Sequence, residues 1–282
     1  MKTAIVTDST AFLPAELKND PQLSIISIPI ILDGKVLNEG QDVFAEGYYE
    51  LLKNSLDFPK TSQPVIGEVL KLMEELQKQG YEDVILITLS SGISGYFSTI
   101  NALKSEVPGI TIWPFDSLIT SVPMGMMVKV ALEMAHKEIA PAKIIEKLSD
   151  IRANMAAYMI VDDLNHLVRG GRLTNGLALI GGLLKIKPVL TFEDGKIIVA
   201  EKIRTSRKAF NRVEDLLLSK AEENLQDYQF FIIHGNYLEA AEEEKARLLA
   251  KKPDMDIEIA YFGPVIGTHL GEKALGFGWV KK

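Results

Sequence analysis

The chain alternates short apolar runs with segments whose apolar residues recur every three or four positions. Val84–Leu89 is short, β-branched and almost uninterrupted, which is typical of a strand buried on both faces of a parallel sheet. Further strands of this kind are predicted over Ala4–Val6, Leu23–Leu32 and Ile110–Phe115. Helical spacing is found over Val65–Leu76, Tyr96–Val107, Val122–Ala135 and Pro141–Ala153. Strands that alternate with helices predict a parallel, three-layer α/β domain.

The pattern changes after residue 155, where the predicted strands begin to pair as hairpins. Lys187–Leu190 and Lys196–Ile203 flank Glu193-Asp194-Gly195, a turn that favours antiparallel pairing and therefore a mixed sheet. Gly263–His269 is expected to be a loop. Strands are also expected over 158–161, 230–233, 257–262 and 274–280, and helices over 206–219 and 237–251. We therefore divide the chain into an N-terminal parallel α/β domain, 1–155, and a C-terminal α/β domain, 156–282.

Composition narrows the possible functions. The 282 residues are 47% apolar and 24% charged, with a formal net charge of −7 and no cysteine. The missing cysteine excludes disulfides, thiol catalysis and thiolate metal sites. No long basic block occurs, so no nucleic-acid partner is expected. No apolar run reaches the roughly 18 residues of a membrane span, and the N-terminus does not match a signal peptide, so we expect a cytoplasmic protein without stable membrane insertion.

Hydroxyl side chains occur at two predicted helix starts. Ser90, Ser91 and Ser94 follow the strand Val84–Leu89. Thr61-Ser62-Gln63-Pro64 stands directly before the predicted helix Val65–Leu76. Ligands of open α/β sheets bind outside the carboxyl ends of the strands, where hydroxyls and helix-start N–H groups favour an anion. Serine and threonine are also preferred capping residues, so ordinary capping remains an alternative for both segments.

The motifs of several enzyme classes are missing from the sequence. It has no H-E-x-x-H pair, no P-loop, no dinucleotide fingerprint and no G-x-S-x-G turn. His269 lies between glycines, and this histidine either contributes to a site or is simply exposed. Arg172 and Arg204 belong to two basic clusters that either face an anionic partner or are solvated surface charge. The hydroxyl, histidine and arginine side chains of this sequence are therefore better suited to binding an anion than to catalysing a reaction.

Taken together, these segments resemble the DegV family over the whole chain. The resemblance rests on Val6-Thr7-Asp8-Ser9-Thr10, Thr61-Ser62-Gln63-Pro64, Leu89-Ser90-Ser91-Gly92-Ile93-Ser94-Gly95, Asp116-Ser117, Gly170-Gly171-Arg172, Leu184-Lys185-Ile186-Lys187-Pro188 and Gly267-Thr268-His269. It implies a two-layer C-terminal domain with a mixed sheet, and a lipid site at the domain interface. It also implies the fatty-acid-binding subunit of a bacterial fatty acid kinase, with no cofactor and no metal. Such a subunit holds a long-chain fatty acid in a buried tunnel while a separate ATP-dependent kinase subunit phosphorylates its carboxylate for phospholipid synthesis.

The resemblance also assigns roles to individual residues. The carboxylate ligands would be Thr61 and Ser94, with His269 close by and Ser62 as a weaker candidate. Arg172 and Arg204 match positions tied to kinase docking or phosphoryl transfer, and we expect both to act outward. The apolar segments Val122–Ala135 and Leu177–Leu184 would line the tunnel, which makes Met127 and Leu183 candidate wall residues.

Two departures from the family pattern and two rival functions remain. Glu272-Lys273 stands where the family usually has Pro-Gly, and Ser121-Val122-Pro123 departs from a Ser-x-Gly pattern. A hydrolase or transferase that acts on an acyl substrate through Ser94, His269 and an aspartate such as Asp116 is the first rival. A regulatory or scaffold protein without a lipid is the second.

Overall fold

The computed structural model describes residues 2–176 and 187–282. Its N-terminal half is built on a four-stranded parallel sheet in the order β2-β1-β6-β7. The strands are β1 (Thr3–Asp8), β2 (Leu23–Ile26), β6 (Asp83–Thr88) and β7 (Thr111–Asp116). All six residues of β1 and of β6 are buried, as expected for central strands covered on both faces.

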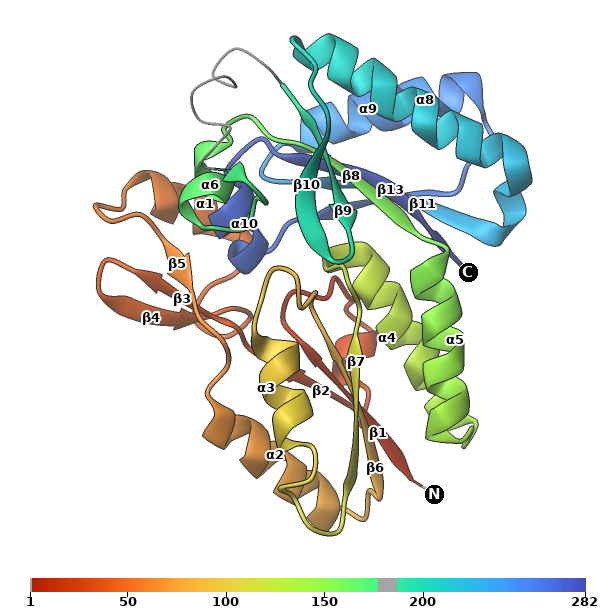
Figure 1. Cartoon of the computed structure of the whole chain (residues 1–282). Helices are drawn as coiled ribbons and strands as arrows, with labels where there is room; N and C mark the ends of the chain where they lie inside the picture. The colour runs from red at the N-terminus through yellow and green to blue at the C-terminus, as the bar shows by residue number, and fades with distance from the viewer. Residues whose placement is uncertain (1, 177–186) are drawn as a thin grey trace.

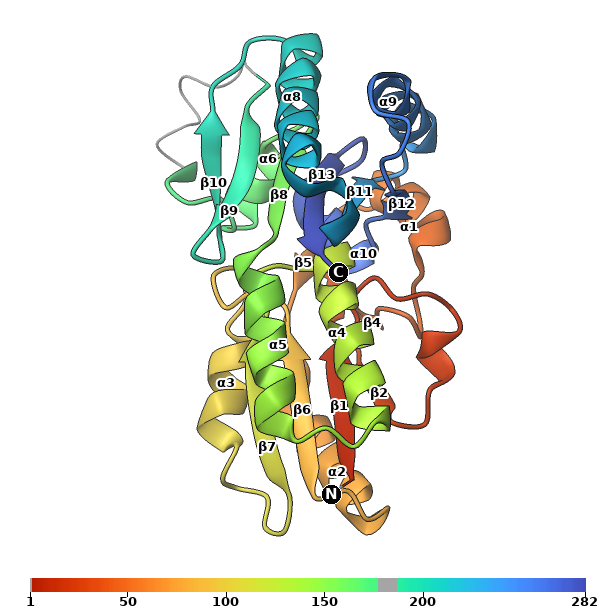
Figure 2. The ribbon, with the colours of Figure 1, turned by 90° about the vertical axis from the view of Figure 1, so that its right-hand side faces the viewer.

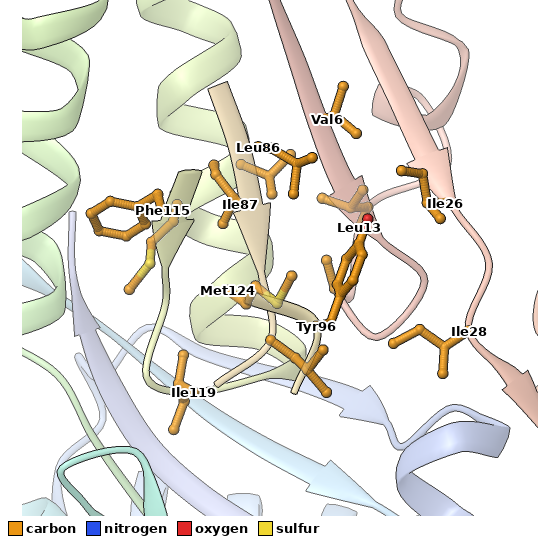
Figure 3. Packing of buried hydrophobic residues seen from close by; sticks show 14 of the residues in the cluster. Val6, Leu13, Ile26, Ile28, Leu86, Ile87, Tyr96, Phe115, Ile119 and Met124 are labelled. Atoms are coloured by element: carbon orange, nitrogen blue, oxygen red, sulfur yellow. The ribbon is translucent and has the colours of Figure 1, made fainter. Parts of the chain in front are cut away.

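Helices cover both faces of this sheet. In Figure 2, α4 (Ser121–His136) and α5 (Pro141–Ala153) lie in front of the sheet, and α2 (Ile66–Lys78) and α3 (Tyr96–Leu103) lie behind it. This confirms the predicted three-layer parallel domain. Met124 of α4 packs with Leu86, Phe115 and Ile119 in the core (Figure 3).

The C-terminal half is a two-layer structure with a six-stranded mixed sheet, as expected. Its order is β10-β9-β8-β13-β11-β12, in which β11 and β12 are parallel and the other pairs antiparallel. Two long helices, α8 (Ser206–Asn224) and α9 (Leu238–Lys251), cover one face (Figure 1). The strands are β8 (Ala156–Ile160), β9 (Val189–Glu193), β10 (Lys196–Glu201), β11 (Tyr228–His234), β12 (Ile257–Tyr261) and β13 (Leu275–Lys281).

The alternation of side chains along β11 separates the two faces of this sheet. Phe230 and Ile232 belong to the core under α8 and α9, whereas Phe231 and Ile233 belong to the core that faces the N-terminal half. The second face is therefore apolar as well, and among the described residues no pair of helices comparable to α8 and α9 covers it. It meets the carboxyl ends of the parallel strands, where the hydroxyl-rich loops lie.

Two sequence predictions were wrong in detail. The predicted strand Leu23–Leu32 is divided between two sheets, because β2 ends at Ile26 and Pro29 begins β3 (Pro29–Leu32). Strand β3 pairs with β4 (Lys35–Asn38) and β5 (Lys60–Thr61) in a small antiparallel sheet. The predicted loop Gly263–His269 is mostly a helix, α10 (Pro264–Leu270), whose first residue is a proline that suits the start of a helix.

Four further short elements complete the described chain. These are the 3-10 segments η1 (Leu17–Asn19) and η2 (Leu225–Asp227), with α1 (Ala45–Lys53) and α6 (Asn165–Arg169) as short helices. Helix α1 is interrupted near its start, where Gly47 has a φ of 81°. Within the described residues, no helix combines the length and hydropathy that crossing a membrane requires.

Candidate functional site

A cavity of about 290 Å³ lies between the two halves of the chain. Its lining comes from the hydroxyl-rich loops of the N-terminal half and from the uncovered face of the mixed sheet. One group of lining residues is polar: Thr61, Ser62, Gln63, Ser94, Arg172 and His269. The remaining wall is mainly apolar and includes Ile93, Ile119, Phe192, Ile197, Phe231, Ile233, Phe262, Val265, Ile266 and Phe277. A cavity with this division suits an elongated apolar molecule that carries one polar group.

Thr61 and His269 meet directly inside this cavity. The Thr61 hydroxyl lies 2.8 Å from Nε2 of His269, although the two residues are far apart in the sequence. Helix α10 holds the histidine in place, because Tyr48 and Thr268 share a 2.6 Å hydrogen bond and Thr268 donates to the Pro264 carbonyl. His269 is therefore a built part of the cavity and not an exposed loop residue.

Burial keeps His269 neutral. The pKa of His269 falls to about 3, first because of burial and then because of the positive charges of Arg172 and His166. Nδ1 of His269 is buried and has no hydrogen-bond partner among the described residues. Since orphaned N–H groups are rarer than orphaned acceptors, the proton belongs on Nε2, which then donates to Thr61. The Thr61 hydroxyl hydrogen is left to donate into the cavity.

The Gly-Gly-Arg segment contributes two features to the site. A Cβ on Gly170 would lie 2.5 Å from Nδ1 of His269, so a glycine is needed for this close approach. Arg172 then turns into the cavity, where its Nε donates to the Ile93 carbonyl at 3.2 Å and Nη1 donates to the Gly170 carbonyl. This corrects the expectation that Arg172 acts outward, because its half-buried guanidinium lines the same cavity as Thr61.

The serines of the site have separate roles. Ser94 accepts a hydrogen bond from the Tyr96 N–H at 3.2 Å just ahead of α3, whose N-cap is Gly95 and has no side-chain capping bond, and its own hydrogen remains available to the cavity it lines. Ser62 is exposed at the edge of the cavity, where its hydroxyl donates to the Gln63 carbonyl at 3.3 Å. Ser90 is fully buried and donates to the Gly195 carbonyl at 2.6 Å.

Two other candidate residues, Met127 and Arg204, lie apart from the cavity lining. Met127 is 0% exposed and belongs to the core, so the wall near α4 is formed by Thr120, Ser121 and Pro123 instead. Leu183 lies outside the described residues. Arg204 is exposed at the junction between β10 and α8 and is not part of the cavity.

The Ser94–His269–Asp116 arrangement of the rival hydrolase is not assembled. Nε2 of His269 is engaged by Thr61, and Asp116 accepts hydrogen bonds from the backbone N–H groups of Ser91 and Leu118 at 3.1 and 3.0 Å. A hydrolytic triad needs the histidine bonded to both the serine and the aspartate. The described residues also hold no group of three or more His, Asp or Glu side chains placed to bind a metal ion.

Several cavity residues had no signal in the sequence. Phe192 and Ile197 come from the β9–β10 hairpin, whose turn reaches the N-terminal half. Ile119 comes from the loop before α4 and Ser121 is the first residue of that helix; Leu118 and Ser121 have positive φ values of 56° and 57°. Only long-range packing brings these residues to the site, although non-glycine residues with positive φ commonly mark functional loops.

The fold defines this chain as a two-domain α/β protein with a largely apolar cavity between its two halves. The DegV family model matches residues 2–282, and the chain belongs to the DegV family. A DegV domain-containing protein of Listeria monocytogenes, lmo2514, is 44% identical over 278 residues and covers 99% of this chain and 98% of its own length.

Two solved structures extend the comparison. The fatty acid binding DegV family protein SAG1342 from Streptococcus agalactiae superposes with a TM-score of 0.94 at 42% identity, covering 100% of this chain and 99% of that one. DegV of Bacillus subtilis, described as a fatty acid binding protein, superposes with a TM-score of 0.91 at 42% identity, with 100% of both chains covered. Both cover the whole fold, including the interface that holds the cavity.

Proposed function

We propose that this protein binds one long-chain fatty acid in the cavity between its domains. The observation that carries the proposal is the polarity of the cavity, with hydroxyl, imidazole and guanidinium groups gathered in an otherwise apolar lining. Fatty-acid binding by the two similar DegV proteins supports the same ligand class. Burying about 14 methylenes at roughly 0.8 kcal/mol each offers on the order of 11 kcal/mol before entropy losses.

The carboxylate would be held by groups with complementary roles. Thr61 and Ser94 each keep a hydroxyl hydrogen to donate, and neutral His269 orients Thr61 by donating to its oxygen. Arg172 supplies a partly buried positive charge. Hydrogen bonds to a charged group contribute about 1.5–3 kcal/mol each, so these contacts fix the position of the headgroup while the tail supplies most of the affinity.

A double substitution tests the headgroup assignment. Thr61→Ala with Ser94→Ala should weaken binding of a long-chain fatty acid by about a hundredfold, because about 3 kcal/mol of hydrogen bonding is lost. Binding of the matching fatty alcohol should change much less. Ser62→Ala is the matched control, since Ser62 donates to Gln63 at the exposed edge. Undiminished fatty-acid binding by the double variant would contradict the site.

We further propose that the bound carboxylate is presented to a separate ATP-dependent kinase subunit. Arg204 supports this finer proposal because it is exposed, lies outside the cavity and can grip a phosphate or carboxylate through two N–H groups. Arg204→Ala should leave fatty-acid binding unchanged and lower kinase-coupled acyl-phosphate formation by about tenfold or more. Lys202→Ala is the control, since Lys202 is a neighbouring exposed cation. Acyl-phosphate formation by this protein without any kinase would reject the carrier role.

A further inference from the structure

A second cavity of about 390 Å³ lies next to the first and shares the wall residue Ser121 with it. Its lining comes from the loop Ser9–Leu13, from the segment Glu39–Ala45 and from the start of α10 at Gly263 and Pro264. The fatty-acid proposal makes no use of these residues. The lining combines one buried carboxylate and three aromatic rings with the exposed Lys18.

The carboxylate belongs to Glu39, which is only 5% exposed. Its Oε2 accepts from the Ser9 hydroxyl at 2.6 Å, and its Oε1 accepts from the Val265 N–H at 3.1 Å. A carboxylate has about four acceptor positions, so these two bonds leave capacity for a donor from a ligand. Glu39 is therefore held rigidly against the cavity without being saturated.

The aromatic rings lie at the more open part of the cavity. Phe12 and Tyr261 contact each other edge to face, with ring centroids 5.3 Å apart and an interplanar angle of 85°. Phe44 is 57% exposed and Tyr261 is 42% exposed, so apolar faces remain available to a ligand. A cation placed against an aromatic face is attracted by the negative charge density of the ring.

Charged and titratable groups of opposite effect surround Glu39. Asp8 of β1 and Lys18 of η1 interact with Glu39 electrostatically, as do the neutral hydroxyls of Tyr48 and Tyr49 on α1. Lys18 is exposed, whereas Asp8 is fully buried. Burial raises the pKa of Glu39 to about 7 and that of Asp8 to about 6, so a cation that enters the cavity would favour ionised Glu39.

We propose that this second cavity binds a small organic cation, an amine or quaternary ammonium, whose charge faces Glu39 and whose carbon groups contact Phe12, Phe44 and Tyr261. A neutral apolar ligand would leave the carboxylate unpaired, and an anion would be repelled by it. The described residues offer no cluster of three ligands for a metal ion.

Helix α10 connects the two cavities. Gly263 and Pro264 line the second cavity, whereas Val265 and His269 line the first. Glu39 accepts from the Val265 N–H at the first turn of the same helix. A cation bound to Glu39 would therefore alter the contact that fixes α10 and change fatty-acid affinity, a coupling that rests on the proposed function and is reciprocal.

Titration with tetramethylammonium chloride tests the cation site, with tert-butanol as the neutral probe and sodium chloride at matched ionic strength. We expect saturable binding of the cation that strengthens by up to about tenfold from pH 6 to pH 8 as Glu39 ionises. Glu39→Gln should weaken binding by about tenfold or more, and Phe44→Ala by several-fold. Glu46→Gln, which removes an exposed carboxylate nearby, is the matched control.

The outcomes separate the site from its coupling. Equal binding of tert-butanol, no saturable binding of the cation, or wild-type affinity in both Glu39→Gln and Phe44→Ala overturns the cation site. Phe44 is exposed, so its variant stays informative even if Glu39→Gln fails to fold. A cation site that leaves fatty-acid affinity unchanged overturns the coupling alone. Cation binding by a protein that takes up no fatty acid supports the second site while rejecting the proposed function.

Discussion

Among the contacts that join the two halves around the cavities, two differ clearly in chemistry. The hairpin seam, formed by Ser90, Gly92 and Gly195, is neutral and depends on close backbone approach. A Cβ on Gly92 would lie 2.2 Å from the Gly195 carbonyl oxygen. The helix seam, formed by Ser9, Glu39 and Val265, depends instead on an ionisable carboxylate. The hairpin seam therefore leaves no room for a larger side chain, whereas the stability of the helix seam depends on pH.

The largest difference between the seams should appear in the pH dependence of stability. The pKa of Glu39 is raised from 4.5 to about 7 in the folded protein, so folding favours the protonated form. The stabilisation of the folded protein by protonated Glu39 is complete below pH 4.5 and is lost as pH rises through about 7. Between these limits the loss amounts to about 3 kcal/mol, at about 1.4 kcal/mol for each pKa unit.

Glu39→Gln should remove this part of the pH dependence. We expect the free energy of unfolding, measured with urea, to fall between pH 4.5 and pH 8 in both proteins. The fall should be smaller in the variant than in wild type by about 3 kcal/mol. Asp8, whose pKa burial raises to about 6, titrates in both proteins, and its interaction with Glu39 is part of the difference between them. Glu46→Gln is the control, and parallel pH profiles for wild type and Glu39→Gln would refute the ionisable helix seam.

A smaller effect is expected at the hairpin seam from added volume. Gly92→Ala should destabilise the protein by about 2 kcal/mol, because the added methyl group meets backbone atoms of Gly195 that must move away. If the cavity holds a fatty acid, the displaced hairpin should also release it faster, since Phe192 and Ile197 of that hairpin line the cavity. Thermal or urea unfolding and lipid-release rates measure the two effects.

Gly67→Ala is the matched control for this change. Gly67 lies in α2, and an added Cβ there would meet no atom within 4 Å. Its replacement should be neutral or stabilise the helix by about 1 kcal/mol. Equal effects of the two substitutions would show that the contact between Gly92 and Gly195 is not tight in solution.

The smallest effect should come from the hydrogen bond of the hairpin seam. Ser90→Ala removes the donor to the Gly195 carbonyl and the acceptor of the Gly92 N–H, and should cost about 1–2 kcal/mol. Unlike the effect of Glu39→Gln, this cost should not vary between pH 5 and 8, because a hydroxyl does not titrate there. Ser98→Ala, at an exposed position of α3, is the control for urea unfolding at both pH values. A cost that follows the Glu39 profile would show that the seams are not independent.

Local patterns predicted most of the fold. Helix α5 was predicted with the bounds Pro141–Ala153 that the structure has, and β6 within one residue at each end. The pattern was misleading at Leu23–Leu32, because one apolar run serves two different sheets. It was also misleading at Gly263–His269, where the glycines outweighed the helix-start signal of Pro264.

The site was predictable mainly through the motifs that the chain shares with the DegV family. Thr61, Ser94 and His269 were expected to lie near one another, and all three line one cavity. The inward direction of Arg172 depends on its hydrogen bonds to Ile93 and Gly170, which no local pattern encodes. The contact between Glu39 and Val265 joins residues 226 positions apart, so only the folded chain reveals it.

The most direct test of the proposed function is native mass spectrometry of the whole protein purified from bacteria. We predict that each chain carries one long-chain fatty acid, and that the Thr61→Ala, Ser94→Ala double variant loses most of it. An emptied protein should take up added fatty acid with a stoichiometry of one. A protein that arrives empty and takes up none, or that carries an apolar molecule without a carboxylate, would contradict fatty-acid binding at this cavity.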